Sequence, residues 1–574
     1  MESLGKLFTA GGGVRQGDPL SPLLFVLAAD FLRSMINKAR TMGLINLPIP
    51  MEHNQDFPIL QYADDTLIIV EGDARQLFFL KSLLNTFSMS AGLKVNYHKT
   101  MLVPINISEH KVEILARTFG CNAGSLPFTY LGLPLSLTRP VGQDFLPLIN
   151  RCERRLAGVS SFLNQAGRLE LTNAVFSALP TFYLCSLELP KAVIKQIDKF
   201  RKHCLWQGAE INARKPPKAA WKMVCADKRD GGLGVIDIRK QNDALMLKTL
   251  HKFFNKLDLP WVQLIWEKHY KSGKLPNNIK KGSFWWRDVL KLLTKFKSIT
   301  TVSIQSGKSC LFWNDSWRPI SPATAAPELF SFAKNKFLSV HAVATTNVIS
   351  DMFHLPVSRE ALVQMQALEN DLSQLTLSQG NDNWNYIWGT NRFSSSRVYK
   401  ALTEHPTVHP TFKWVWANPC QPKHKVFFWL LLKDRLSTKN ILRRRHMFID
   451  SYNCALCTDQ VEESLAHLFL HCTFARQCWN LLGVTIPNDE SFPQIVSTIR
   501  AQVSSRFSIV ATILLCWVIW TARNGLIFNG IQANVQNCRR SLLQELKLVQ
   551  LRVKQCLQSS FELWIVSLNL DPPL

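Results

Sequence analysis

The chain has 574 residues, a length that allows several domains of about 150 residues with packed cores. Its hydrophobic content of 47% and charged content of 19% exclude an intrinsically disordered protein, and its formal net charge of +25 favours a polyanionic partner such as nucleic acid. The cysteines follow no even framework and the first ten residues lack the apolar segment of a secretory signal, so we expect reduced thiols in the nucleus or cytoplasm. The longest apolar run, residues 507–520, is shorter than a membrane span of about 18 residues and predicts a buried helix, with no membrane partner.

The N-terminal region opens with a turn, Gln16-Gly17-Asp18-Pro19, that leads into a helix. Ser21 and Pro22 suit a helix start, as an N-cap followed by proline in the first turn. Apolar residues then recur at helical spacing until Gly43, which is expected to end the helix.

Two adjacent carboxylates, Asp64 and Asp65, stand between the apolar runs 57–60 and 67–70. The runs are short and rich in branched residues, so they predict strands that place the carboxylates at the tip of a hairpin. Such a pair is unfavourable unless cations lie beside it. One use is to hold divalent metals that clamp a phosphoryl transfer. The alternative is a surface turn, where aspartate is common.

Further elements follow in order. A second amphipathic helix is predicted for residues 74–91 with Gly92 as its stop, then a strand at 93–97. Residues 125–136 form a β-rich segment, and beyond it the pattern becomes mainly helical, with short tryptophan-rich strands such as 311–317.

Thiol and imidazole side chains recur near the C-terminus in the pattern C-x2-C-x9-H-x4-C, formed by Cys454, Cys457, His467 and Cys472. These ligand types at this spacing suit tetrahedral Zn²⁺, and four protein ligands imply a structural ion. A short helix at 462–470 is expected to carry the histidine. His471 and Cys478 remain alternative ligands.

A basic segment precedes the cysteines, with the cationic residues Lys423, Lys425, Lys433, Arg435, Lys439, Arg443, Arg444 and Arg445. Basic side chains interleaved with Phe427, Phe428 and Trp429 fit phosphate contacts combined with base stacking. The alternative is an amphipathic helix with an aromatic core face, which we favour for the three aromatic residues. For Lys439 and the run 443–445 we favour nucleic-acid contacts.

Three motifs follow one another along the N-terminal region: VRQGDPLSP at residues 14–22, YADD at 62–65, and GLKVN at 92–96 with Lys99-Thr100. In this order they resemble the palm of a reverse transcriptase from a LINE-type (non-LTR) plant retrotransposon. The order of several motifs makes the resemblance specific.

Later stretches agree with it. Residues 130–134 resemble the primer-grip end of that palm, and residues 166–168, 179–180 and 231–238 resemble the helical region that follows it. Residues 454–472 resemble the zinc-binding domain associated with reverse transcriptases.

The resemblance implies roles for individual residues. The turn Gln16-Gly17-Asp18-Pro19 would contact the templating base and the incoming nucleotide. Asp64 matches the aspartate that binds Mg²⁺, and Asp65 is its catalytic neighbour. Lys94 or Lys99 would face nucleotide phosphates, and the spacing does not choose between them. RNA and DNA are the implied partners.

The implied fold is α+β: a partial reverse transcriptase palm, then a mainly helical region and a small zinc-binding domain. We expect a palm, a helical thumb or connection, a tryptophan-rich mixed region, the zinc-binding domain and a C-terminal helical region at residues 1–136, 137–300, 301–392, 393–482 and 483–574.

In that family another palm aspartate lies several tens of residues before the turn, and residues 1–14 contain none. Two metals need several carboxylate oxygens. We therefore expect an N-terminally truncated RNA-directed DNA polymerase that is defective by itself. The alternative is a non-catalytic, zinc-containing nucleic-acid-binding remnant.

Overall fold

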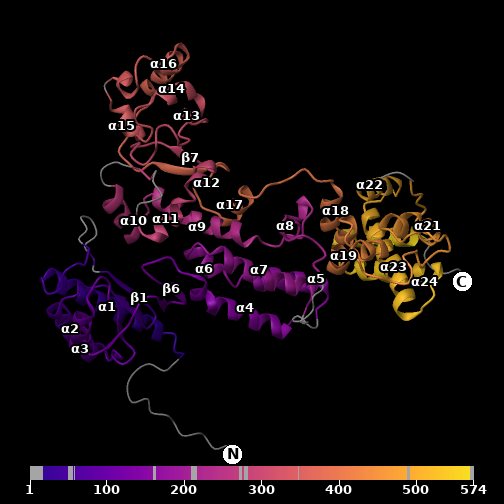
Figure 1. The fold of residues 1–574 in the computed structure, drawn as a ribbon, viewed down its shortest axis with the longest axis horizontal. Coiled ribbons are helices and arrows are strands. Elements are labelled where there is room, and N and C mark those ends of the chain that lie inside the picture. Colours follow the sequence, from indigo (N-terminus) through magenta and orange to yellow (C-terminus); the bar gives the residue numbers. More distant parts are fainter. Residues whose placement is uncertain are drawn as a thin grey trace, which may run out of the picture. The chain divides into compact units, whose positions relative to one another are not determined.

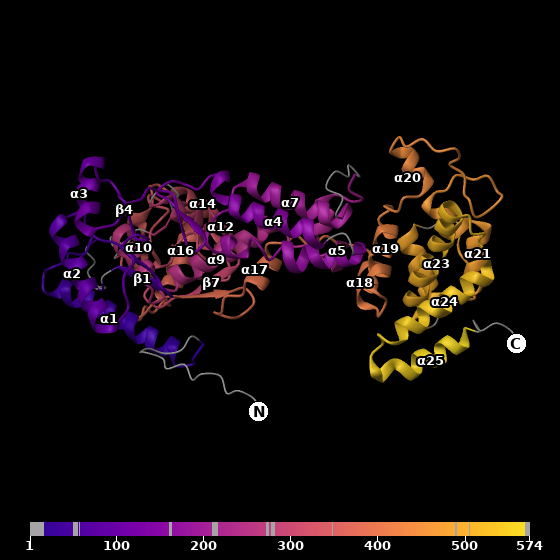
Figure 2. The same ribbon diagram turned by 90° about the horizontal axis from the view of Figure 1, so that it is seen from below.

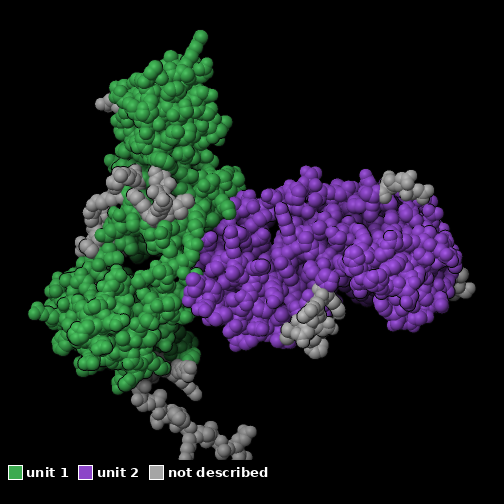
Figure 3. All heavy atoms as spheres, in the orientation of Figure 1, with its two compact units in different colours: residues 1–140, 247–393 green, residues 141–246, 394–574 purple. Residues whose placement is uncertain are grey.

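The computed structural model describes residues 17–49, 56, 58–159, 163–208, 216–270, 275–276, 282–346, 348–487, 491–503 and 505–568. The described chain is mostly helical with short strands, a mixed α and β composition as predicted (Figures 1 and 2). It divides into two compact units, Met1–Pro140 with Leu247–Phe393 and Val141–Met246 with Ser394–Leu574 (Figure 3). Each unit is therefore built from two separate stretches of sequence.

The N-terminal part of unit 1 gathers three helices around a small core (Figure 1). These are α1 (Ser21–Thr41), α2 (Ala74–Ala91) and α3 (Glu109–Phe119). Their packed apolar side chains include Leu32, Ile36, Leu77, Leu80, Leu84 and Leu115.

Helix α1 confirms the predicted helix, although it begins at Ser21 with Leu20 at the N-cap position. Gly43 follows its end with φ of +73°. The helix buries Leu32 but leaves Leu23 and Leu27 largely exposed. Only part of its apolar surface therefore faces the core.

The predicted hairpin is present, formed by β1 (Ile59–Tyr62) and β2 (Asp65–Ile68) in antiparallel pairing. A two-residue turn of Ala63 and Asp64 joins the strands, with Ala63 at φ of +49°. The sequence pattern predicts strands that stop two residues short of this turn on each side. This tight turn keeps the flanking residues in the ladder, so Asp65 is the first residue of β2 and not a turn residue.

Helix α2 has the predicted bounds because both of its ends carry strong signals. The carboxylate of Asp73 accepts hydrogen bonds from the amides of Arg75 and Gln76, and Gly92 closes the helix with φ of +72°. The strand predicted at 93–97 is wrong, because this segment lies outside any ladder and ends in a turn.

Two further strand pairs complete this part. β3 (Met101–Leu102) pairs in parallel with β4 (Asn122–Ala123). β5 (Phe128–Tyr130) and β6 (Leu133–Leu135) form an antiparallel hairpin, which confirms the β-rich segment. Its two turn residues have positive φ, as the tightest hairpin turns require.

The second stretch of unit 1 surrounds one antiparallel pair, β7 (Thr300–Ser303) with β8 (Asn383–Tyr386). Most helices of this stretch have one or two turns, and α16 is longer. They are α10 (Pro260–Ile265), η5 (Trp266–Tyr270), α11 (Phe284–Leu290), α12 (Leu293–Ser298), α13 (Pro322–Ala325), α14 (Pro327–Phe332), α15 (Val340–Ala344), η6 (Ile349–Met352) and α16 (Arg359–Ser373).

Buried carboxylates organise the loops of this stretch. Asp382 accepts hydrogen bonds from the amides of Gln305, Gly307 and Ser309 at 2.9, 2.8 and 2.9 Å. Asp315 accepts the amide of Leu311 at 2.7 Å. The predicted strand at 311–317 is wrong, because Leu311 alone forms an isolated antiparallel bridge, with Ser339, and residues 312–314 turn the chain away from it.

Unit 2 is helical in its described residues. Its first stretch contains η1 (Gly142–Phe145), α4 (Leu146–Val159), α5 (Gln165–Leu171), η3 (Thr172–Phe176), α6 (Thr181–Ser186), α7 (Lys191–Trp206), α8 (Trp221–Cys225), η4 (Lys228–Asp230) and α9 (Ile238–Phe254), which runs across the boundary into unit 1. Its second stretch contains α17 (Ser395–Ala401), α18 (Thr411–Ala417), α19 (Pro422–Leu432), α20 (Lys439–Arg444), η7 (His467–His471), α21 (Thr473–Asn480), α22 (Phe492–Gln502), α23 (Ser508–Asn529), α24 (Val535–Gln550), η8 (Gln555–Leu557) and α25 (Gln558–Ser567).

Helix α23 is the centre of the C-terminal core. It confirms the buried helix predicted for 507–520 and is longer, with 22 residues. Among the described residues it is long and apolar enough to cross a membrane by length and composition, and 61% of its most apolar window is buried inside the protein. It packs against α19 and α24, which cover its apolar surface.

Candidate zinc centre and nucleic-acid interface

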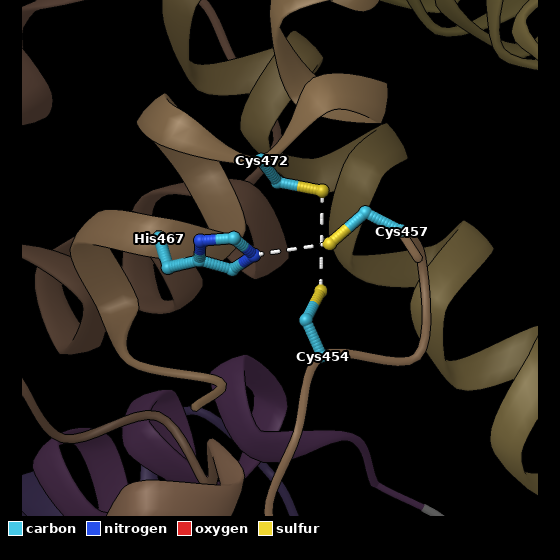
Figure 4. Close-up of side chains that lie close together, drawn as sticks. All are labelled: Cys454, Cys457, His467 and Cys472. Atoms are coloured by element: carbon cyan, nitrogen blue, oxygen red, sulfur yellow. Dashed lines mark hydrogen bonds between the residues drawn. The ribbon is translucent and has the colours of Figure 1, made fainter. Parts of the chain in front are cut away.

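Four side chains converge in unit 2, as Figure 4 shows. The ligand atoms of Cys454, Cys457, His467 and Cys472 all lie within 4.8 Å of one another. The Sγ atoms of Cys454 and Cys472 are 3.9 Å apart, and the Cys457 Sγ is 3.3 Å from the His467 Nε2. The structure thus brings together the four residues that the spacing singled out.

The cluster has the dimensions of a tetrahedral zinc site. Zinc–sulfur bonds of about 2.3 Å place two ligand sulfurs about 3.8 Å apart, and a sulfur and an imidazole nitrogen about 3.6 Å apart. The sulfur–sulfur separation of 3.9 Å agrees with the first value, and the sulfur–nitrogen separation of 3.3 Å is slightly shorter than the second. Three thiols and one imidazole are also the donor set that structural zinc prefers.

Short elements position the ligands. Residues 452–463, which carry Cys454 and Cys457, form a loop that we call the cysteine knuckle. Two backbone hydrogen bonds close it, from the Cys454 amide to Val461 O at 2.8 Å and from the Glu463 amide to Tyr452 O at 2.9 Å. His467 begins η7, and Cys472 immediately precedes α21. The predicted helix around the histidine is therefore present but starts later than residue 462.

The local electrostatics favour a thiolate at Cys472. Its pKa is lowered to about 5, first by the hydrogen bond from the Cys454 thiol and also by the amides at the start of α21. The same hydrogen bond and burial raise the pKa of Cys454. Zinc binds thiolates, so an ion would displace the remaining thiol protons.

The two alternative ligands lie outside the cluster. Cys478 is buried on α21, and its thiol is hydrogen-bonded to Cys538 on α24, which raises the pKa of Cys478. His471 ends η7. The sequence left both alternatives open, and the geometry favours His467 and Cys472.

The basic residues predicted to contact nucleic acid are Lys439, Arg443 and Arg444 on α20 and Arg445 at its end. Several have partners within the fold. Arg443 pairs with Glu462 at 3.3 Å, Arg444 pairs with Asp434 at 2.8 Å, and the Lys439 ammonium donates to Asn453 O at 2.8 Å.

The aromatic residues of the basic segment have a different role. Phe427, Phe428 and Trp429 on α19 are buried in the core of unit 2, which confirms the core interpretation. Trp429 donates its indole N–H to Gly231 O at 2.9 Å. They are therefore not available for base stacking.

The carboxylates of Asp64 and Asp65 are exposed at the hairpin tip in unit 1. Gln61 of the same hairpin donates to Ala29 O of α1 at 3.3 Å, which ties the hairpin to that helix. Burial and then the charge of Asp65 raise the pKa of Tyr130, so the two hairpins lie close together. Within the described ranges, no third acidic, histidine or cysteine side chain joins the two aspartates.

The turn before α1 is described from Gly17 onward, and Gln16 lies outside the described residues. Gly17 has φ of +92°, a conformation that glycine adopts readily. Asp18 accepts the amide of Leu20 at 2.8 Å and so shapes the start of α1, with Pro19 exposed between them.

Lys94 and Lys99 are both exposed. In the described part of the chain neither ammonium forms an ion pair with a carboxylate. The structure therefore leaves the choice between them open.

Sequence reasoning missed Glu463, a completely buried acid. Its carboxylate accepts the Lys439 amide at 3.0 Å, at the first residue of α20. It also accepts a hydrogen bond from the guanidinium of Arg523 on α23 at 2.7 Å. Adjacent Glu462 and Glu463 look alike in sequence, and no local pattern distinguishes the buried one.

Comparison with known families matches two parts of the chain. Residues 3–135 match the family described as reverse transcriptase (RNA-dependent DNA polymerase). Residues 393–479 match the family described as zinc-binding in reverse transcriptase, and this range contains the whole cysteine and histidine cluster.

Curated relatives point the same way. An Arabidopsis thaliana protein, provisionally named a ribonuclease H protein, is 25% identical over 60% of this chain and 56% of its own length. A protein of transposon TX1 from Xenopus laevis is 25% identical over 42% of this chain and 18% of its own. The Pol polyprotein of the type-1 retrotransposable element R2 from Popillia japonica is 24% identical over 42% of this chain and 33% of its own.

The chain thus spans little more than half, or less, of the length of these three relatives. The two family matches cover separate parts of it, one near the N-terminus and one around the four-ligand cluster. This chain therefore carries a reverse transcriptase domain and the zinc-binding domain of reverse transcriptases, and its curated relatives include proteins of a transposon and of a retrotransposable element.

Proposed function

We propose that this protein binds RNA and DNA through a basic module that a structural Zn²⁺ ion stabilises. The observation that carries the proposal is the convergence of the four ligand atoms within 4.8 Å. With four protein ligands the ion has no open position for substrate, so its role is to fix the fold of the knuckle and of α20.

The charge of the chain supports a nucleic-acid partner. The net charge is +25, and the family to which residues 3–135 belong acts on a nucleic-acid template. Arg443 and Arg444 are exposed on α20, next to the proposed zinc site. Phosphate contacts by such residues are independent of base sequence and weaken with salt.

A salt series on the full chain tests the binding. We expect the logarithm of the association constant for RNA or DNA to fall linearly with the logarithm of salt concentration. A triple variant, Arg443→Gln with Arg444→Gln and Arg445→Gln, is expected to flatten that slope. The matched control is Arg151→Gln with Arg154→Gln and Arg155→Gln, which removes the same charge from exposed positions of α4.

Equal slopes for the two triple variants would contradict a specific role for α20. Negligible binding of the unmodified protein at low salt would contradict the proposal as a whole.

The second candidate is RNA-directed DNA polymerase activity with Mg²⁺, favoured by the position of Asp64 and Asp65 at an exposed hairpin tip. Two-metal phosphoryl transfer holds metals about 3.5–4 Å apart with several carboxylate oxygens. The described residues supply this pair alone at the tip. We therefore propose binding without polymerisation by this chain.

Primer extension separates the two candidates. We expect the purified protein to add no nucleotide to an RNA-templated primer with magnesium or manganese. Templated incorporation that disappears in Asp64→Ala would replace the binding proposal with the polymerase.

A further inference from the structure

The turn that follows α20, at residues 445–448, exposes a phenylalanine. Phe448 is 93% exposed, and Met447 before it is 51% exposed. Single exposed apolar side chains are common on protein surfaces and need no explanation by themselves. What distinguishes Phe448 is the way its backbone is held and the charge around it.

Three hydrogen bonds hold the turn. The His446 amide donates to Arg443 O at 2.9 Å, and the Met447 amide donates to Leu442 O at 3.0 Å. The Tyr452 hydroxyl donates to Met447 O at 3.0 Å. The ring of Phe448 therefore projects from a fixed backbone, which reduces the entropy lost when a ligand covers it.

The turn is also tied to the proposed zinc site. Tyr452, which holds the turn, accepts the Glu463 amide through its backbone oxygen and lies two residues before Cys454. Glu463 in turn caps the first residue of α20. The exposed ring and the metal ligands thus belong to one hydrogen-bonded assembly.

Positive charge lies beside the turn. Arg445 forms no ion pair with a carboxylate in the described part of the chain. Burial lowers the pKa of the Lys218 ammonium, and the charges of Arg445 and then Arg168 lower it further. Both arginines therefore repel Lys218, so an anion such as a phosphate would be favoured beside it.

We propose that Phe448 is a stacking platform for a base of single-stranded nucleic acid whose phosphates run along the Arg445 side of α20. An aromatic ring beside a basic track is the arrangement that binds unpaired strands, because every base offers a flat face and duplexes keep theirs hidden. This inference rests on the proposed nucleic-acid binding and adds the class of strand and the residue that selects it.

Fluorescence anisotropy with the full chain tests it, using labelled oligouridine RNA, oligothymidine DNA and a blunt RNA duplex of equal length. We expect Phe448→Ala to lose roughly tenfold in affinity for both single strands, as the removal of one stacked base predicts. Its salt slope and its duplex affinity stay unchanged, because no charge is removed. Phe448→Trp is expected to retain single-strand binding.

Two further variants make the result specific. Arg445→Gln should reduce the salt slope by about one, since one phosphate contact is lost. Phe528→Ala is the matched control, since Phe528 is 74% exposed in the same unit at the end of α23. It is expected to bind like the unmodified protein. Zinc content of each variant verifies that the knuckle is intact.

The outcomes distinguish the stacking role of Phe448 from the proposed nucleic-acid binding in general. If the unmodified protein binds single strands and Phe448→Ala binds them equally well, the stacking platform is refuted while nucleic-acid binding stands. An equal loss of affinity for single strands and duplex would also refute it. If the unmodified protein binds none of the three probes at low salt, both proposals fail.

Discussion

The guanidinium of Arg523 on α23 donates two hydrogen bonds to the carboxylate of Glu463, at 2.7 and 3.1 Å, and both side chains are almost fully buried. The same carboxylate holds the first amide of α20, and the Glu463 backbone closes the cysteine knuckle. One buried ion pair therefore joins the core helix, the basic helix and the proposed metal site.

Breaking this pair is expected to destabilise unit 2 strongly. Glu463→Gln keeps the shape of the side chain but leaves the buried Arg523 charge without a carboxylate, which typically costs about 3–5 kcal/mol. The measurement is the shift in denaturant midpoint, followed by tryptophan fluorescence. A change below about 0.5 kcal/mol would contradict the structure of this pair.

The exposed ion pair between Arg444 and Asp434 is the control. Asp434 has φ of +50°, a conformation that asparagine also tolerates, so Asp434→Asn removes the charge with little backbone strain. Because both partners are solvated, we expect a cost of less than about 1 kcal/mol. The difference between Glu463→Gln and Asp434→Asn in the loss of free energy of unfolding measures the effect of burial.

The proposed ligand set predicts which histidine holds zinc. His467→Ala removes one of four ligands, so after dialysis against a chelator the variant should retain almost no zinc. His471→Ala should retain about one zinc per chain, because its ring is not part of the cluster. Zinc content by atomic emission gives the answer, and the reverse pattern would assign the site to His471.

Stability at acidic pH is predicted to depend on His424. Its ring is fully buried on α19, and burial lowers its pKa to about 4, against the opposing effect of Glu545. Between about pH 6.5 and 4 the unfolded chain binds a proton that the folded chain does not. The free energy of unfolding should therefore fall as pH falls through this window, by up to about 1.4 kcal/mol per pH unit.

His424→Gln should remove this slope, as measured by denaturant midpoints from pH 4 to 8. His405 provides a comparison of opposite sign, because its hydrogen bond with Asp230 raises its pKa. The stability that this exposed pair adds is present below about pH 6.5 and is lost as pH rises through the raised pKa. An unchanged acid slope in His424→Gln would contradict the assignment.

The sequence predicted elements best where local chemistry decides them. The bounds of α2 follow from two residues. The Asp73 side chain caps the start of the helix, and Gly92 ends it by adopting a positive φ. The sequence spacing also predicted which four side chains converge. Cys454 and Cys457 lie in one loop, His467 begins the short helix η7, and Cys472 directly follows that helix.

Prediction failed where distant contacts decide. In the segment 93–97 apolar and polar residues alternate as in a strand, but it lies outside any described ladder. The burial of Glu463 was also missed, because its partner Arg523 lies on α23, 60 residues further along the chain, and no local pattern reveals such a contact.

The glycine-rich stretch 231–234 gives a final prediction about unit 2. A side chain at Gly232 would place its Cβ 2.0 Å from the backbone oxygen of Ala226, and backbone cannot move aside as a flexible side chain does. The two segments are joined by the Gly234 amide, which donates to Ala226 O at 2.9 Å. Gly232→Ala is therefore expected to cost about 3 kcal/mol or more, because the close packing of the loop must open.

Gly158→Ala is the matched substitution in the same unit. Gly158 lies in the last turn of α4 with no atom within 4 Å of the added Cβ, so the change should be neutral or stabilising by up to about 1 kcal/mol through helix propensity. Thermal unfolding of both variants makes the comparison. If Gly232→Ala unfolds at the same temperature as Gly158→Ala, the close approach of residues 226 and 232 is wrong, and with it the packing of the loop that Trp429 contacts.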